Sequence, residues 1–262
     1  MSLSLSLSIS LLVFAVGVAL VAGLVTGLAG FGFALVGTMA LATALPPSTA
    51  VVVMLIPILA ANLSLLGELD AASLRSCGRR FGSYVAAALG GTLIGMALID
   101  RLPDAPLELA LGVVTLGFVA TAQRAVEIPG FDAVRGPEFG ESTRAKIALG
   151  SVSGLLFGAT NVGVQMVAYV RSRELSHGLF VGVIVLVFVG INAVRVGAAA
   201  LFGLYSGVGV FALSVALAVV GVVGVSGGRR LRSRVPERER RWFVLALLSV
   251  IGVRLVTSGL DA

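Results

Sequence analysis

The sequence predicts an all-α, polytopic membrane protein, built from two inverted repeats of about four membrane segments each. Three observations predict this fold: an apolar composition, apolar runs of membrane-spanning length, and a glycine pattern that occurs twice. Of the 262 residues, 58% are hydrophobic and only 12% are charged, and soluble domains carry roughly twice that charged fraction. Little of the chain is therefore left for a soluble domain.

The apolar residues fall into runs of about 20, the length that a helix needs to cross about 30 Å of hydrocarbon. Transmembrane β-strands are shorter and alternate strictly, so a barrel is not expected. Residues 1–10 lack the positive charge of a signal peptide, and we interpret them as an uncleaved part of the first membrane region. The runs cover residues 8–43, 48–67, 81–99, 106–123, 146–170, 178–202, 206–226 and 242–259.

A glycine pattern in the first run recurs 131 positions later, and an asparagine recurs one position out of step. Glycine lets a helix backbone leave helical angles, which is tolerated at membrane depth only where protein or a wet cavity covers it. We therefore expect each repeat to begin with a Gly-broken helix, either re-entrant or discontinuous. A glycine-packed ordinary helix is the alternative, and the first run is long enough to include a full span. The recurring residues are Gly23, Gly27, Gly32 and Asn62, then Gly154, Gly158, Gly163 and Asn192.

Basic residues in the loops indicate the orientation. The arginine-rich segment 229–241 is cytoplasmic by the positive-inside rule. If every run spans once, the basic residues divide poorly between the two sides. If the run 146–170 is a hairpin with both ends in the cytoplasm, every loop Lys and Arg except Arg101 lies inside. Residues 1–123 and 146–262 then form inverted repeats, as in many secondary transporters, joined by a cytoplasmic loop at 124–145.

Two arginines lie within apolar runs, where a charge is costly unless it is paired or hydrated. Arg195 follows Asn192 by three positions, on one helix face, and no Asp or Glu deep in a run offers it a partner. Such an arginine suits the binding of an anion through charge-assisted hydrogen bonds; a structural pair and snorkelling are the alternatives. For Arg254, near the end of its run, snorkelling is favoured.

Polar groups beside the predicted breaks are expected to extend this site. Alternatively, they only satisfy the hydrogen bonds of the broken backbone, or they form hydrogen bonds between helices. Backbone N–H groups at half-helix N-termini add positive dipole ends. The candidate substrate-binding residues are Arg195, Asn192, Asn62, Asn161, Thr160, Gln165, Gly30, Gly32 and Gly163.

The composition argues against several other functions. Cys77 is the only cysteine and His177 the only histidine, so no disulfide within the chain and no cysteine or histidine metal cluster is expected. No P-loop, zinc motif or Ser-His-Asp grouping occurs, so we expect neither catalytic residues nor a cofactor. The net charge of +6 is attributed to basic loop residues that set the orientation in the membrane, and not to nucleic-acid binding. The expected partners are a small anionic substrate and the lipid bilayer, and the GxxxG faces permit a homodimer.

The sequence resembles the sulfite exporter TauE/SafE family over nearly its whole length. The first half does so at Gly23–Gly32, Leu45-Pro46-Pro47 and Asn62, and the second at Gly154–Gly158, Leu175–Gly182 and Asn192–Arg195. The second break, Ala159-Thr-Asn-Val-Gly163, departs from the glycine-rich family pattern. The resemblance implies an exporter of sulfite, sulfonates or related organic acids in the cytoplasmic membrane of a bacterium or archaeon. An uncoupled anion channel and a non-transporting membrane assembly factor are the alternatives.

Overall fold

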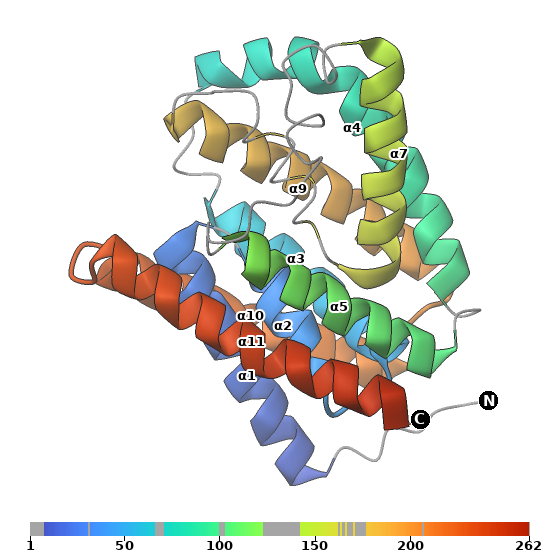
Figure 1. Cartoon of the computed structure of the whole chain (residues 1–262), viewed down its shortest axis with the longest axis vertical. Helices are drawn as coiled ribbons and strands as arrows, with labels where there is room; N and C mark the ends of the chain where they lie inside the picture. Colours follow the sequence, from blue (N-terminus) through green and yellow to red (C-terminus); the bar gives the residue numbers. More distant parts are fainter. Residues whose placement is uncertain are drawn as a thin grey trace.

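The computed structural model describes residues 8–30, 32–65, 71–99, 103–122, 142–161, 163, 166, 170, 177–205 and 207–261. Among these residues it contains helices and no strand, which confirms the all-α class (Figure 1). In chain order the helices are α1 (Ile9–Ala29), α2 (Phe33–Leu41), α3 (Pro47–Leu65), α4 (Ala71–Ile99), α5 (Asp104–Ala122), α7 (Thr143–Thr160), α9 (His177–Leu201), α10 (Val208–Leu231) and α11 (Glu237–Asp261).

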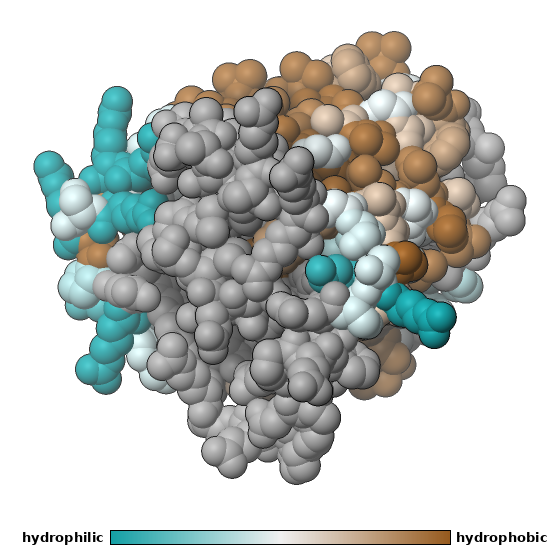
Figure 2. Space-filling model, turned by 90° about the horizontal axis from the view of Figure 1, so that it is seen from above, coloured by the Kyte–Doolittle hydropathy of each residue, from teal (hydrophilic) through white to brown (hydrophobic). Residues whose placement is uncertain are grey.

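Several of these helices suit a membrane. Within the described residues, four stretches are long and apolar enough to cross it: α1, α3, the Phe81–Leu98 part of α4, and α10. One side of α10 exposes large apolar side chains at four-residue spacing, at Phe211, Val215, Val219 and Val223. Figure 2 shows such hydrophobic residues gathered over a broad part of the surface, with hydrophilic residues concentrated elsewhere. An apolar surface of this extent fits lipid rather than water, and the chain is a multi-pass membrane protein.

The structure differs from the sequence prediction at the start of α4. The predicted run begins at residue 81, whereas α4 begins at Ala71 and continues for 29 residues. Arg75, Cys77 and Arg79 therefore belong to a helix and not to a loop. At 1.5 Å per residue, 29 residues extend about 44 Å, well beyond the about 30 Å of hydrocarbon. The helix can continue past the apolar layer because its backbone hydrogen bonds are satisfied within it.

The closest helix pairs each join an early part of the chain to a late part. Helix α1 packs against α10, α4 against α7, and α5 against α11. Figure 1 shows α4 and α7 side by side at one end of the molecule, with α5 and α11 side by side toward the other. Helix α3 contacts α2, α9 and α10. Helices from the part of the chain before residue 123 therefore pack against helices from the part after it.

Glycines set the close approach in all three pairs, and in α1–α10 and α4–α7 their contacts also show the relative direction of the helices. A Cβ on Gly23 would lie 2.9 Å from Gly224 Cα, and one on Gly27 would lie 2.8 Å from Gly228 Cα. The contacting residues have increasing numbers in the same direction along both helices, so α1 and α10 run parallel. In the same way, a Cβ on Gly154 or Gly158 would meet the backbone of α4 at Ala88 or Thr92. Helices α7 and α4 are therefore also parallel, and small residues bring their backbones together.

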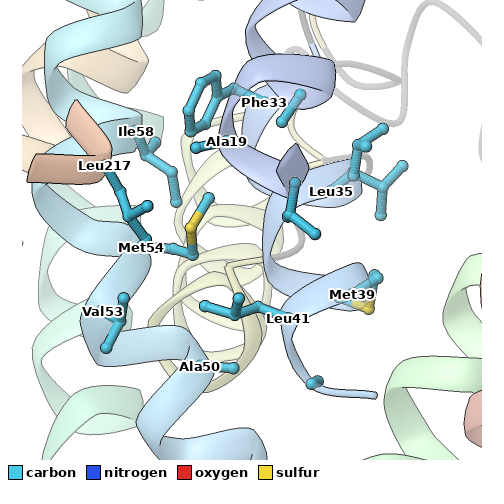
Figure 3. Packing of buried hydrophobic residues seen from close by; sticks show 14 of the residues in the cluster. Ala19, Phe33, Leu35, Met39, Leu41, Ala50, Val53, Met54, Ile58 and Leu217 are labelled. Carbon is cyan, nitrogen blue, oxygen red and sulfur yellow. The ribbon is translucent and has the colours of Figure 1, made fainter. Parts of the chain in front are cut away.

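The largest apolar cluster among the described residues is built around α2 and α3. Figure 3 shows Phe33, Leu35, Met39 and Leu41 of α2 beside side chains of α3 that include Met54 and Ile58. Gly37 leaves room for the end of the Met54 side chain. This packing fixes α2 between α1 and α3, and it holds the turn after Leu41 in place.

Candidate functional site

Helices α1 and α7 end in the same way, at positions 131 residues apart. Gly30 follows α1 with φ +84°, and its N–H donates to Thr26 O at 2.7 Å. Asn161 follows α7 with φ +60°, and its N–H donates to Phe157 O at 2.9 Å. Both are left-handed C-caps, which glycine adopts without strain and asparagine adopts more readily than most residues. Asn161 thus occupies at the end of α7 the capping position that Gly30 occupies at the end of α1.

Helix α2 begins directly after the first of these caps. Its N-cap, Gly32, has φ +112°, a conformation that a residue with a Cβ rarely adopts. The run predicted at 8–43 is accordingly divided into two helices by the glycines that the sequence singled out. In the predicted run 146–170, α7 ends at Thr160.

The guanidinium of Arg195 lies against the last turn of α7. Arg195 is fully buried. Its Nη2 donates to Gly158 O at 3.2 Å, and its Nη1 donates to Asn192 Oδ1 at 3.3 Å. Its Cζ lies 4.6 Å from the centre of the Phe157 ring, within cation–π range. A carbonyl, an amide and an aromatic face therefore surround this cation.

The helices around Arg195 carry no acidic residue. Helix α9 packs against α3 and α4, and the guanidinium reaches α7; the sequences of these four helices contain no Asp or Glu. Arg195 Nε has no hydrogen-bond partner within the described part of the chain. Because a buried charge is costly without a counter-charge, this site is suited to an anion.

The side chain of Asn161 reaches from the end of α7 to the first half of the chain. It is fully buried, and its Nδ2 donates to Thr38 Oγ1 on α2 at 2.9 Å and to Val51 O on α3 at 3.0 Å. Its Oδ1 has no hydrogen-bond partner among the described residues. A polar atom in this state is exceptional in a protein interior. Asn161 therefore links the two halves while offering a free acceptor.

Two more predicted site residues lie at the same place. Thr160 is buried, and its hydroxyl donates to Leu156 O at 2.5 Å. Gly163 is buried against two aromatic rings, since a Cβ there would lie 2.6 Å from Phe188 Cε1 and 3.2 Å from Phe157 Cε2. The two rings are 5.5 Å apart between centroids. Gly163 thus belongs to the aromatic cluster that also carries Arg195.

Of the remaining predicted site residues, Asn192 bonds to Arg195, and the others are placed elsewhere or lie outside the described residues. Asn62 and Asn192 make matching hydrogen bonds, from Nδ2 to the carbonyl four residues earlier, at 2.8 Å and 2.7 Å. In the described structure no hydrogen bond joins Asn62, Gly30 or Gly32 to Arg195. Gln165 lies outside the described residues.

Arg254 is unlike Arg195. It is exposed, and its Nη2 donates to Thr43 O at 3.3 Å in the turn between α2 and α3. It has no contact with the Arg195 cluster in the described structure.

Sequence reasoning missed Phe157, Phe188 and Val51 as parts of this site. Phe157 and Phe188 are ordinary apolar residues of apolar helices, and Val51 contributes only its backbone carbonyl. The hydrogen bond from Asn161 to Val51 spans 110 positions, and no local pattern marks such a pair.

Comparison with known proteins assigns the chain by family. A family model described as Sulfite exporter TauE/SafE matches residues 15–255. This span includes every candidate site residue named above. No curated protein and no solved structure matches the chain.

Proposed function

The chain belongs to the TauE/SafE family of sulfite exporters, and from this membership we propose that it is a secondary transporter which exports small anions such as sulfite, sulfonates or related organic acids. The anion binds Arg195 near the middle of the membrane, between the end of α7 and α9. The protein acts in the cytoplasmic membrane of a bacterium or archaeon, without a cofactor and without catalysing a reaction.

The buried guanidinium of Arg195 carries this proposal. Three of its neighbours are neutral groups of α7 and α9, and the helices around it supply no carboxylate. A bound anion neutralises the charge and accepts from the nitrogen that protein groups leave unbonded. Arginine is suited to oxyanions because its planar donors match two oxygens at once.

We also propose that residues 1–123 and 146–262 are inverted repeats joined by the loop 124–145. The equivalent caps at Gly30 and Asn161 support this arrangement. So do the parallel pairs, in which the first helix of each half packs on a later helix of the other half. Helix α10 ends at the arginine-rich segment 229–241 and α4 begins at its own basic residues. With both basic ends in the cytoplasm, α1 runs inward and α7 runs outward.

Inverted repeats give the anion an alternating route. In transporters of this type, substrate sites lie at broken helices near the membrane midplane, and one repeat rocks against the other. Two contacts support a site of this type here: Arg195 lies against the last turn of α7, and Asn161 bonds across to α2 and α3. Movement between the halves therefore changes the surroundings of the anion.

Counterflow of labelled sulfite in proteoliposomes tests the transport proposal. We expect saturable exchange with internal sulfite, and competition by sulfoacetate, taurine, sulfate and acetate in an order that defines the substrate class. Saturable exchange distinguishes a carrier from an uncoupled channel, whose flux does not depend on anion on the far side. Absence of movement for every anion in the series contradicts transport and favours a role in membrane assembly.

The topology has a separate test at Cys77, the only cysteine of the chain. Inverted repeats place the beginning of α4 in the cytoplasm, so a membrane-impermeant maleimide should label Cys77 only after cells are permeabilised. The control is Ala44→Cys in a Cys77→Ser background, because Ala44 is exposed in the turn between α2 and α3, which lies outside. Labelling of Cys77 in intact cells is incompatible with the inverted arrangement.

A further inference from the structure

The Arg195 site contains a donor nitrogen and an acceptor oxygen that form no hydrogen bond with the described residues. Arg195 Nε is a donor, Asn161 Oδ1 is an acceptor, and both residues are fully buried. Neither atom has a hydrogen-bond partner among the described residues. The two residues adjoin the same turn of α7, because Arg195 bonds to Gly158 O and the Asn161 N–H bonds to Phe157 O.

The acceptor role of Asn161 Oδ1 is fixed by its neighbours. An amide side chain can often be turned over, which exchanges its oxygen and nitrogen. Here Val51 presents a backbone carbonyl, which only accepts, so the amide nitrogen has to face Val51. Thr38 Oγ1 takes the second N–H. Both donors of the Asn161 amide are therefore used, and its oxygen is left for another partner.

A simple anion can bond to Arg195 but leaves Asn161 Oδ1 without a donor. Its oxygens accept from Arg195, but they cannot donate to Asn161 Oδ1, and two acceptors placed together repel each other. A ligand that combines a negative charge with an O–H or N–H group satisfies both atoms. A buried acceptor left without a donor carries the full cost of its desolvation, so the site should distinguish two ligands that differ only in such a group.

We propose that the site takes oxyanions or sulfonates that carry a hydrogen-bond donor, such as hydrogen sulfite or a hydroxy- or aminosulfonate, in preference to donor-free anions. This inference rests on the proposed function, since it defines the ligand class of the same site. Arg195 holds the anionic group, and Asn161 Oδ1 accepts from the donor of the ligand. The amide oxygen of Asn161 then distinguishes ligands by whether they carry a donor, while its amide nitrogen stays hydrogen-bonded to α2 and α3.

Two matched sulfonates test this inference. Isethionate and propane-1-sulfonate have the same number of heavy atoms and the same charge, and they differ in a terminal hydroxyl against a methyl group. Each is titrated into the purified wild-type protein in detergent, and the rise in melting temperature gives the dissociation constant. We expect isethionate to bind at least about tenfold more tightly, the effect of one satisfied buried acceptor. Simple hydrophobic preference would favour propane-1-sulfonate, so it cannot produce this result.

Two variants assign the preference to Asn161. Asn161→Gly keeps the left-handed cap and removes the acceptor, so the affinity ratio of the two sulfonates should fall to about one. Thr38→Val removes one partner of the amide nitrogen and leaves Oδ1 in place, so the ratio should persist. Equal binding of the two sulfonates to the wild type, or a ratio that persists in Asn161→Gly, overturns the inference.

The same readout separates this inference from the transport proposal. Sulfite counterflow together with equal sulfonate affinities retains the transporter and rejects the donor requirement. A clear preference for isethionate without counterflow of any anion retains the ligand class and rejects transport.

Discussion

Replacing Arg195 with glutamine is expected to lower sulfite counterflow about a hundredfold. The substitution removes the charge that attracts the anion and the unbonded Nε that faces it. A hydrogen bond to a charged group contributes about 1.5–3 kcal/mol, and about 1.4 kcal/mol corresponds to a tenfold change. The loss should appear as a raised half-saturation concentration, measured by counterflow over a range of sulfite concentrations.

Arg254→Gln is the matched control for this prediction. Arg254 also donates to a backbone carbonyl, at 3.3 Å, but it is exposed and lies away from the Arg195 cluster. Its replacement should leave counterflow within about twofold of the wild type, since exposed charged contacts contribute little. Elution of both variants as single species shows whether the fold survives. Wild-type counterflow by folded Arg195→Gln protein would place the anion site elsewhere.

Gly154→Leu is expected to abolish the folded protein. A Cβ at Gly154 would lie 2.8 Å from Ala88 Cα and closer still to the Ala88 carbonyl, so α7 has to move away from α4. Overpacking by one or two methylene groups costs about 1–3 kcal/mol, and a leucine here meets rigid backbone. We expect aggregated protein in size-exclusion chromatography and no cooperative melting transition.

The control for this substitution is Gly90→Leu on α4. Gly90 is exposed, and a Cβ there would meet nothing within 4 Å, so the leucine faces lipid. Its melting temperature should equal or exceed that of the wild type, because leucine is a better helix former than glycine. If Gly154→Leu elutes and melts like Gly90→Leu, the close approach of α4 and α7 is not required for the fold.

Local patterns in the sequence were sufficient to predict the all-α class and several apolar helices of membrane-spanning length. Runs of apolar residues marked the membrane segments because the thickness of the bilayer sets their length. The glycine-containing stretches 23–32 and 154–163 include positions 30, 32 and 161, where φ is positive. Arg195 was recognisable as a charge inside an apolar run, and its burial is confirmed.

The contacts of the site were not predictable in this way. Asn161 bonds to Thr38 over 123 positions and to Val51 over 110, and Arg195 bonds to Gly158 over 37. Such pairs depend on how the helices pack, which apolar periodicity does not specify when all faces are apolar. The extension of α4 to Ala71 was also missed, because basic residues end an apolar run without ending a helix.

The pairing of α1 with α10 has a consequence for the order in which the helices assemble. Gly23 and Gly221 are separated by almost 200 positions, so at about 5–20 residues per second α1 waits about 10–40 s for its partner. Thr92 and Gly154, which join α4 to α7, are only 62 positions apart. The α4–α7 pair can therefore form during translation. The glycine face of α1, in contrast, stays in lipid until α10 is inserted. Helix α1 is thus made long before its partner and reaches its final place late, so changes in α10 act on its assembly.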